Sequence, residues 1–228
     1  MAYSQKCSNI LKIIKGANNF TDWMYSEIRP HLKNNILELG SGIGTFSEYL
    51  MNDFYNVTLT DIETKHLSRF TNVVKLDLEI NDYSKILKSK YDCVVALNVL
   101  EHIKSDSGVF RNIYNILNKG GVFVVLVPAH KWLFYEHDRA VGHHRRYSKR
   151  RLIDLAHSNG FKINKIYYFN FFAIIGRYFG GKILRKNVMS EGPVNFFNKL
   201  VPVFKIIEKY ILRKKIGISL IAVLIKRF

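Results

Sequence analysis

The fold of this 228-residue chain is decided by the stretch Asn35-Ile-Leu-Glu-Leu-Gly-Ser-Gly-Ile-Gly44. Its apolar half predicts a short buried β-strand, and its three glycines predict a tight turn. Apolar residues then recur with helical spacing from Thr45 to Met51, which predicts a helix directly after the turn. A glycine turn between a strand and a helix lets the backbone approach a ligand closely and points helix amides at it. We therefore expect a ligand site here.

Further strand-like runs follow this unit, and several end in a polar residue. They are Val57 to Thr60 before Asp61, Val73 to Leu76 before Asp77, Cys93 to Leu97 before Asn98, Val122 to Val127, Phe161 to Phe169, and Ile218 to Ile225. Between them, one helix is expected to stop at Gly120-Gly121, and another is expected to begin after Ser148 as its N-cap. This alternation predicts an α/β fold.

The predicted architecture is a doubly wound, Rossmann-like, seven-stranded and mostly parallel sheet in a three-layer α/β/α arrangement. We expect one domain over residues 1–228. It divides into an N-terminal helical cap (1–34), a core (35–170), a basic helical insertion (171–217) and a last strand (218–228). Ligands of such sheets bind at the carboxyl ends of the strands, where the polar residues named above gather.

Charge is distributed unevenly along the chain. From Val141 onward there are 19 Lys and Arg against three acidic residues, a net +16 of the total +17. Such a surface attracts polyanions, namely nucleic acid, anionic lipid headgroups or a phosphorylated substrate. The two cysteines, Cys7 and Cys93, predict no disulfide framework, and no apolar run is long enough to span a bilayer. We expect a reducing, cytoplasmic setting.

The glycine turn differs from a dinucleotide fingerprint in its spacing and its charge. The glycines are Gly40, Gly42 and Gly44, and the carboxylate of Glu38 lies two residues upstream, where it would repel a pyrophosphate. Glu38 suits a cationic ligand instead, and S-adenosylmethionine carries both an ammonium and a sulfonium. Asp61 lies 19 residues past Gly42, close to the offset of about 20 at which an acid meets ribose hydroxyls.

With these motifs in their expected order, the sequence resembles the class I S-adenosylmethionine-dependent methyltransferases over nearly its whole length. Glu38 to Gly44 matches that family's first motif, and Ala96 to His102 matches its motif after the fourth strand. The resemblance implies that S-adenosylmethionine is the methyl donor. It further implies Asp61 as the ribose acid, Ile62, Asp77 and Leu78 as adenine contacts, and Asn98 as a backbone contact near the methionine moiety.

The acceptor is expected to meet the polar segment after the fifth strand. His102 and His143 are the candidate bases, because histidine suits proton transfer from a hydroxyl acceptor. The candidate substrate-binding residues are Asp138, Arg145, Arg146 and Tyr147. The two arginines could clamp a substrate carboxylate or phosphate, or could pair internally with Asp138. The segment Asp138 to Tyr147 is similar to a class I subgroup that accompanies cell-surface glycan genes. His102 is shared with ubiquinone-type O-methyltransferases, and no metal site is expected.

The predicted function is O-methylation of a small-molecule, glycan or lipid-linked acceptor. The alternative is an RNA methyltransferase that uses the basic last third as a phosphate track. An apolar stripe with a basic border, from Phe196 to Lys215, could pack in the core, form a homodimer contact, or lie on an anionic membrane. Peripheral attachment at the inner membrane face therefore remains one of the expected settings.

Overall fold

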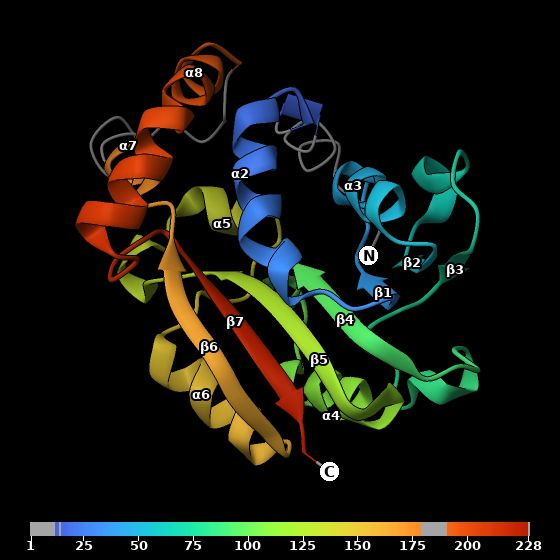
Figure 1. Ribbon diagram of the computed structural model, residues 1–228. Coiled ribbons are helices and arrows are strands. Elements are labelled where there is room, and N and C mark those ends of the chain that lie inside the picture. The colour runs from blue at the N-terminus through green and yellow to red at the C-terminus, as the bar shows by residue number, and fades with distance from the viewer. Residues whose placement is uncertain (1–11, 14, 179–190, 228) are drawn as a thin grey trace.

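The computed structural model describes residues 12–13, 15–178 and 191–227 (Figure 1). Its strands are β1 (Asn35–Leu39), β2 (Asn56–Asp61), β3 (Val73–Lys75), β4 (Tyr91–Leu97), β5 (Leu117–Pro128), β6 (Phe161–Phe169) and β7 (Ser219–Lys226). The α-helices are α2 (Asn18–Ile28), α3 (Thr45–Asp53), α4 (Asp106–Ile116), α5 (Glu136–Ala140), α6 (Lys149–Ser158), α7 (Phe172–Tyr178) and α8 (Glu191–Ile207). Short 3-10 turns include η1 (Arg29–His31), η4 (Leu100–His102) and η5 (Lys131–Leu133), and the π-helical turn η7 (Glu208–Leu212) follows α8.

The seven strands form one sheet in the order β3-β2-β1-β4-β5-β7-β6. Every pairing is parallel except those of β7, which runs antiparallel to both β5 and β6. Strand order reverses between β1 and β4. The strands that follow β1 lie on one side of this pair, and the strands that follow β4 lie on the other side. The carboxyl ends of β1 and β4 lie side by side, since Leu39 pairs with Ala96. The predicted mostly parallel, doubly wound sheet is confirmed.

Two apolar cores cover the two faces of the sheet and make the three layers. Side chains alternate along each strand, so Leu37 faces α4 and α6 while Ile36 faces α2, α3 and α8. On the second face, Trp23 of α2 packs against Phe169 with ring centroids 4.6 Å apart. Figure 1 shows α4 and α6 on one side of the sheet and α2, α3 and α8 on the other.

One predicted boundary is wrong. The helix expected to stop at Gly120-Gly121 ends at Ile116, and both glycines lie within β5. Lys226 explains the earlier stop, because its ammonium donates to the carbonyls of Tyr114 and Leu117 at 2.6 and 2.8 Å. Those contacts satisfy carbonyls that the end of a helix leaves without partners. The chain then continues as an extended strand.

The strand expected from Val122 begins earlier, at Leu117. Ser148 caps α6 as expected, with its hydroxyl accepting from the amide of Arg151 at 3.1 Å. Pro202 lies inside α8. Parts of the predicted cap (1–34) and of the predicted insertion (171–217) lie outside the described residues. In the described ranges, no helix has both the length and the apolar content needed to cross a bilayer.

Candidate active site

The glycine turn has the backbone geometry that its composition predicts. Gly40, Gly42 and Gly44 all have positive φ angles, of 68°, 60° and 79°. At Gly40, a Cβ atom would lie 2.6 Å from Cγ2 of Val99, which follows the end of β4. Only glycine avoids both the strain and the overlap. Because Gly44 is the N-cap of α3, the turn feeds directly into a helix N-terminus.

Two buried carboxylates border the turn. Glu38 is 4% exposed and accepts a 2.5 Å hydrogen bond from the hydroxyl of Ser47. Burial raises the pKa of Glu38, and hydrogen bonding from the hydroxyls of Ser47 and Ser41 opposes that rise. The Ser41 hydroxyl approaches Glu38 without reaching ordinary hydrogen-bond geometry. A cationic group beside Glu38 would favour the ionised carboxylate, so this carboxylate is compatible with an ammonium ligand.

Asp61, at the end of β2, closes the turn from the other side. Its Oδ2 accepts from the amide of Gly42 at 2.8 Å, and its Oδ1 accepts from the amide of Glu63 at 3.0 Å. These two contacts hold the glycine turn in shape. The role of Asp61 at a ribose stays a prediction.

The remaining predicted cofactor residues lie at the ends of β2, β3 and β4. Ile62 is half-buried, Leu78 is buried, and Asp77 is exposed with its Oδ1 accepting from the amide of Glu79 at 2.9 Å. Asn98 is exposed and has a positive φ of 54°, so the backbone turns sharply where β4 ends. All four therefore lie on the carboxyl edge of the sheet, and their contact with a cofactor stays a prediction.

The candidate bases meet just beyond β4. The rings of His102 and His143 lie edge to face with centroids 4.6 Å apart. Burial, reinforced by the charge of His143, lowers the pKa of His102 to about 4, so His102 is neutral at pH 7. Nε2 of His143 lies 3.9 Å from Oε1 of Glu101. Burial raises the pKa of Glu101 to about 7, against the opposing charge of His143.

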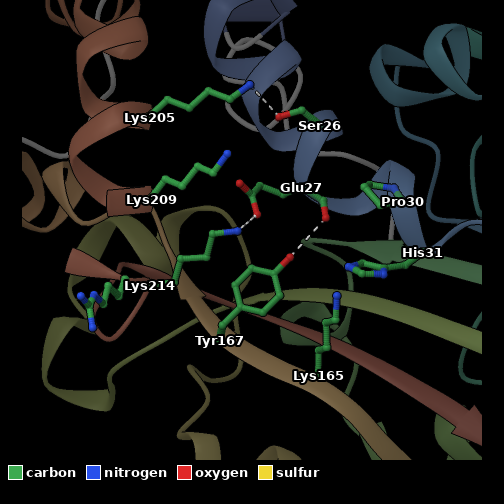
Figure 2. Close-up of a pocket in the computed structure, with 10 residues that line it drawn as sticks. Ser26, Glu27, Pro30, His31, Lys165, Tyr167, Lys205, Lys209 and Lys214 are labelled. Carbon is green, nitrogen blue, oxygen red and sulfur yellow. Dashed lines mark hydrogen bonds and ion pairs between the residues drawn. The ribbon is translucent and has the colours of Figure 1, made fainter. Parts of the chain in front are cut away.

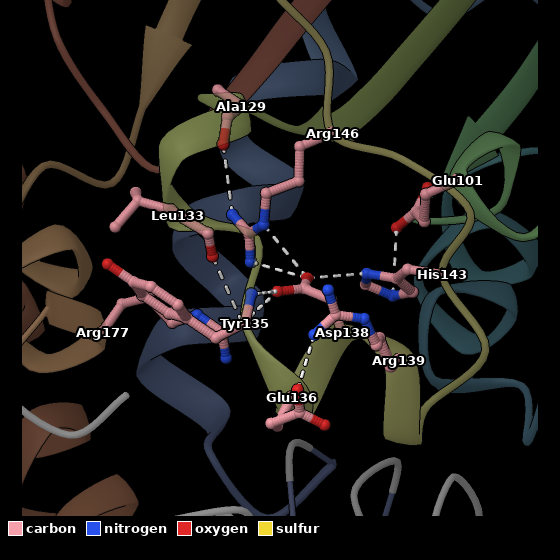
Figure 3. A network of polar contacts seen from close by, with 10 residues as sticks. All are labelled: Glu101, Ala129, Leu133, Tyr135, Glu136, Asp138, Arg139, His143, Arg146 and Arg177. Atoms are coloured by element: carbon pink, nitrogen blue, oxygen red, sulfur yellow. Dashed lines mark hydrogen bonds and ion pairs between the residues drawn. The ribbon is translucent and has the colours of Figure 1, made fainter. Parts of the chain in front are cut away.

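Asp138 is the centre of the polar network that holds His143 (Figure 3). This fully buried carboxylate accepts from Nδ1 of His143 at 2.9 Å, from Nε of Arg146 at 3.0 Å and from the guanidinium of Arg177. Burial alone would raise the pKa of Asp138, but the hydrogen bond from His143 and the charge of Arg146 outweigh it and hold the pKa well below its usual range. Asp138 is therefore an anion that orients His143.

The predicted substrate residues Arg145 and Tyr147 contact a second acid, Asp106. The guanidinium of Arg145 lies 3.2 Å from Asp106 and donates to the carbonyl of Lys104 at 2.8 Å. The hydroxyl of Tyr147, which is fully buried, donates to Asp106 at 3.1 Å. Arg151 contributes a further ion pair to Asp106 at 2.8 Å. In this structure both residues link the segment after α5 to the start of α4.

Three members of the site escaped sequence reasoning. Glu101 belongs to the quoted motif, but nothing in its spacing shows that it is buried beside His143. Asp106 has the sequence position of an acidic residue in the first turn of a helix, where such residues are common. Arg177 lies 39 positions from Asp138 in a basic segment, and only the packing of α7 against α5 brings the two together. A long-range contact of this kind leaves no local signal.

Glu101, His102 and His143 also form a candidate cation site. Each offers one ligand atom, and these atoms lie within 4.8 Å of one another. Both carboxylate oxygens of Glu101 are buried without a hydrogen-bond partner. A carboxylate with two neutral imidazoles is a common ligand set for divalent transition metals. No metal site was predicted from the sequence, so removal of divalent cations tests whether this cluster binds one.

Comparison with known proteins assigns the class of this chain. A family model described as a methyltransferase domain matches residues 20–166. The chain belongs to this methyltransferase family, and with its sheet order it is an S-adenosylmethionine-dependent methyltransferase of the class I fold. The predicted enzyme class and methyl donor are thereby confirmed, whereas the glycan-associated subgroup stays a prediction.

Individual relatives are distant. Malonyl-[acyl-carrier protein] O-methyltransferase 2 of Ilyobacter polytropus is 27% identical over 130 residues, which cover 48% of this chain and 49% of that protein. The chain thus matches about half the length of this curated relative. An S-adenosylmethionine-dependent methyltransferase structure from Mesorhizobium loti has a TM-score of 0.61 at 14% identity, covering 90% of this chain and 98% of that one.

A further structure was solved with S-adenosyl-L-methionine bound. It is phosphoethanolamine N-methyltransferase 2 of Haemonchus contortus, with a TM-score of 0.55 at 18% identity, covering 91% of this chain and 52% of that one. The similar proteins therefore include both O- and N-directed enzymes. Fold alone does not select the acceptor atom, which has to be argued from the site.

Proposed function

We propose that this enzyme methylates an oxygen atom of a small-molecule, glycan or lipid-linked acceptor, with His143 as the base that takes the acceptor's proton. The observation that carries the proposal is the 2.9 Å contact between Nδ1 of His143 and the carboxylate of Asp138. An ionised carboxylate only accepts hydrogen bonds, so Nδ1 carries a proton, and Nε2 is the ring atom left to act as the base in the neutral imidazole. Nε2 is then the basic atom at the carboxyl edge of the sheet.

Donor binding is assigned to the residues around the glycine turn. When bound, S-adenosylmethionine supplies a methyl group already activated by its sulfonium. Glu38 would hold the ammonium, Asp61 the ribose hydroxyls, and the backbone at Asn98 the methionine moiety. Ile62, Asp77 and Leu78 would contact the adenine. This assignment is supported by the buried carboxylate of Glu38, by the close approach that Gly40 allows, and by Asp61, which accepts from the amide of Gly42 in the glycine turn.

In this proposal the acceptor's proton passes to His143, and two nearby carboxylates stabilise the charge that forms. As the acceptor oxygen attacks, its proton moves to Nε2 of His143, which becomes an imidazolium. Asp138 stabilises that cation through Nδ1, and Glu101, whose pKa lies near 7, adds a second nearby carboxylate when ionised. His102 is neutral and half-buried against His143, so it shapes the site without competing for the proton at pH 7.

The arginines receive different roles. Arg146 is 6% exposed and is committed to Asp138 and to the carbonyl of Ala129 at 3.1 Å. These contacts support the internal ion-pair interpretation, so we assign Arg146 the positioning of Asp138. Arg145 is half-buried, and its two terminal nitrogens lie against Asp106 and the carbonyl of Lys104. We therefore assign Arg145 the positioning of Asp106.

The oxygen specificity is supported by one relative as well as by the base. The curated relative from Ilyobacter polytropus is named as an O-methyltransferase of a malonyl group on acyl-carrier protein. A carboxylate acceptor of that kind needs no base, whereas a hydroxyl acceptor does. Activity toward a phenolic hydroxyl that depends on His143 would therefore identify the hydroxyl class of acceptor.

The test measures S-adenosylhomocysteine formation with two probes, catechol and malonyl-acyl-carrier protein. His143→Gln is expected to lower turnover of the hydroxyl probe by roughly 10²–10⁴-fold while leaving S-adenosylhomocysteine binding unchanged. His144→Gln is the matched control, because His144 is the adjacent exposed histidine. Equal turnover in His143→Gln and His144→Gln would remove His143 from the chemistry.

We also propose that the exposed surface of α8 and η7 meets an anionic membrane. Its large apolar side chains are 54–72% exposed: Phe196, Val203, Ile206, Tyr210 and Ile211. The same segment carries Lys199, Lys205 and Lys209, and Arg213, Lys214 and Lys215 follow it. Glu208 is buried, and its carboxylate oxygens accept from the amides of Asn170 and Phe171. Basic and apolar residues on one surface favour an anionic interface. Sedimentation with anionic and neutral vesicles tests this, and equal binding to both would contradict it.

A further inference from the structure

A hollow with a strongly basic lining lies between α2, β6 and the end of α8 (Figure 2). We call it the basic groove and define it by the cations Lys165, Lys205, Lys209, Arg213 and Lys214, with Glu27 as its carboxylate. Its volume is about 530 Å³. None of the residues assigned to the methyl donor or to the Asp138 network lines it, so it is separate from the candidate active site.

Most of the positive charge in the basic groove has no acidic partner. Glu27 forms an ion pair with Lys214, which uses the one carboxylate of the lining. Lys205 donates to the neutral hydroxyl of Ser26 at 3.0 Å. Within the described part of the chain, Lys165, Lys209 and Arg213 form no ion pair. Four of the five cations therefore have no carboxylate partner within the lining.

The backbone places these cations in a defined arrangement. Lys205 and Lys209 are four residues apart across the junction of α8 and η7, so they lie on the same side of the helix. Arg213 and Lys214 follow with positive φ angles of 48° and 56°. Their turn is attached to the sheet, since the amide of Tyr168 donates to the carbonyl of Lys214 at 3.1 Å. Strained non-glycine backbone of this type is concentrated at ligand-binding clamps.

His31 reports the local electrostatic field. It lines the same hollow, and Figure 2 shows its ring beside the ammonium of Lys165. Burial is the main cause that lowers the pKa of His31; the charge of Lys165 lowers it next, Glu27 raises it, and Lys214 lowers it. The His31 ring is therefore close enough to these charges to respond to an anion bound among them.

We propose that the basic groove binds a phosphate group, either in a soluble phosphorylated ligand or in the headgroup of a phospholipid. Lysine ammoniums bind phosphate as point charges, and the Arg213 guanidinium can donate two parallel hydrogen bonds to it. Five cations and one carboxylate leave a surplus of four positive charges, so a ligand with two negative charges balances half of it. Tyr167 and Ser26 are polar residues of the same lining. This site goes beyond the proposed methyl transfer and does not depend on it.

The first experiment titrates the full chain with inorganic pyrophosphate at low salt and follows the His31 ring by NMR. Saturable binding should raise the pKa of His31, because a bound anion favours the imidazolium. Lys165→Gln/Lys209→Gln should weaken binding by at least about tenfold. Lys149→Gln/Arg150→Gln removes the same charge from α6, on the other face of the sheet, and should keep wild-type affinity. Equal affinity in the two double variants, or no saturable shift, overturns the proposal.

A second variant separates binding from folding. Arg213→Gly removes a cation and also relieves a positive φ, so the protein should become more stable while pyrophosphate binds more weakly. Binding of S-adenosylhomocysteine should be unchanged, which distinguishes this site from the methyltransferase site. Arg213→Gly with unaltered pyrophosphate affinity would contradict the assignment.

Vesicles identify the source of the phosphate. If pyrophosphate displaces the protein from phosphatidylglycerol vesicles and the lysine variants bind them poorly, the ligand is a lipid headgroup. If pyrophosphate binds at the groove without affecting vesicle binding, the ligand is a soluble phosphate compound. Single-stranded RNA that shifts His31 at far lower concentration than pyrophosphate would replace the proposal with a nucleic-acid site.

Discussion

The substitution Glu101→Gln should change the free energy of unfolding more favourably at pH 8 than at pH 5. Glu101 is 1% exposed, and burial raises its pKa from the ordinary 4.5 to about 7. Between these two values the folded protein binds a proton that the unfolded chain has lost. The free energy of unfolding therefore falls as pH rises through this window. The stabilising contribution of protonated Glu101 is fully present below pH 4.5 and is lost above pH 7.

The size of the effect follows from the same two values. The gap between 4.5 and about 7 corresponds to ~3 kcal/mol at 1.36 kcal/mol per pH unit. At pH 5 wild-type Glu101 is protonated, so glutamine replaces one neutral side chain with another. At pH 8 glutamine removes a buried charge. His102 titrates in the opposite sense but is present in both proteins, so its contribution cancels in the comparison.

Urea unfolding of wild type and variant at both pH values, in metal-free buffer, measures the effect. The stability difference between the two proteins should change by ~3 kcal/mol in favour of Glu101→Gln on going from pH 5 to pH 8. Glu136→Gln is the control, because Glu136 is 70% exposed in a surface pair with Arg139 and should change little at either pH. An equal stability difference at pH 5 and pH 8 would show that Glu101 is not a buried, high-pKa carboxyl.

Other parts of the structure give three further predictions. Asp138→Ala should lower the free energy of unfolding by ~3–5 kcal/mol in urea titrations, because Arg146 is left buried without its acid; a loss below about 1 kcal/mol would contradict the network. Gly160→Ala should destabilise by ~1–3 kcal/mol in thermal melts, since φ is 84° and the new Cβ would lie 2.9 Å from Tyr114; an unchanged melting temperature would contradict that geometry. Removal of divalent cations with a chelator should leave methyl transfer intact if His143 is the base, whereas activity that is lost and then restored by added metal would assign the Glu101 cluster to a cation.

Local sequence signals were enough to predict most of the fold. The glycine turn, the apolar strands and the Ser148 cap depend on nearby residues, so each could be inferred from a short stretch. The end of α4 could not, because it depends on Lys226, 112 residues after Tyr114. The helix boundary there is determined by a tertiary contact, and the glycine pair that looked like a stop lies in the strand instead.

The candidate site divides in the same way. Glu38, Gly42 and Asp61 were identified from spacing, and they lie together because parallel strands share one carboxyl edge. The neighbourhood of His143 was only partly foreseen. Its histidine and Asp138 were named from local sequence, but the burial of Glu101 and the arrival of Arg177 from α7 depend on packing between distant segments.

Calorimetric titration tests whether the glycine turn binds S-adenosylmethionine. We expect saturable one-to-one binding of S-adenosylmethionine and S-adenosylhomocysteine to the wild-type protein. Binding should be lost in Gly40→Ala, whose methyl group would overlap Val99, and kept in Gly192→Ala, where a Cβ meets nothing within 4 Å. A folded wild-type protein that binds neither compound, or equal affinity in the two alanine variants, would contradict the account.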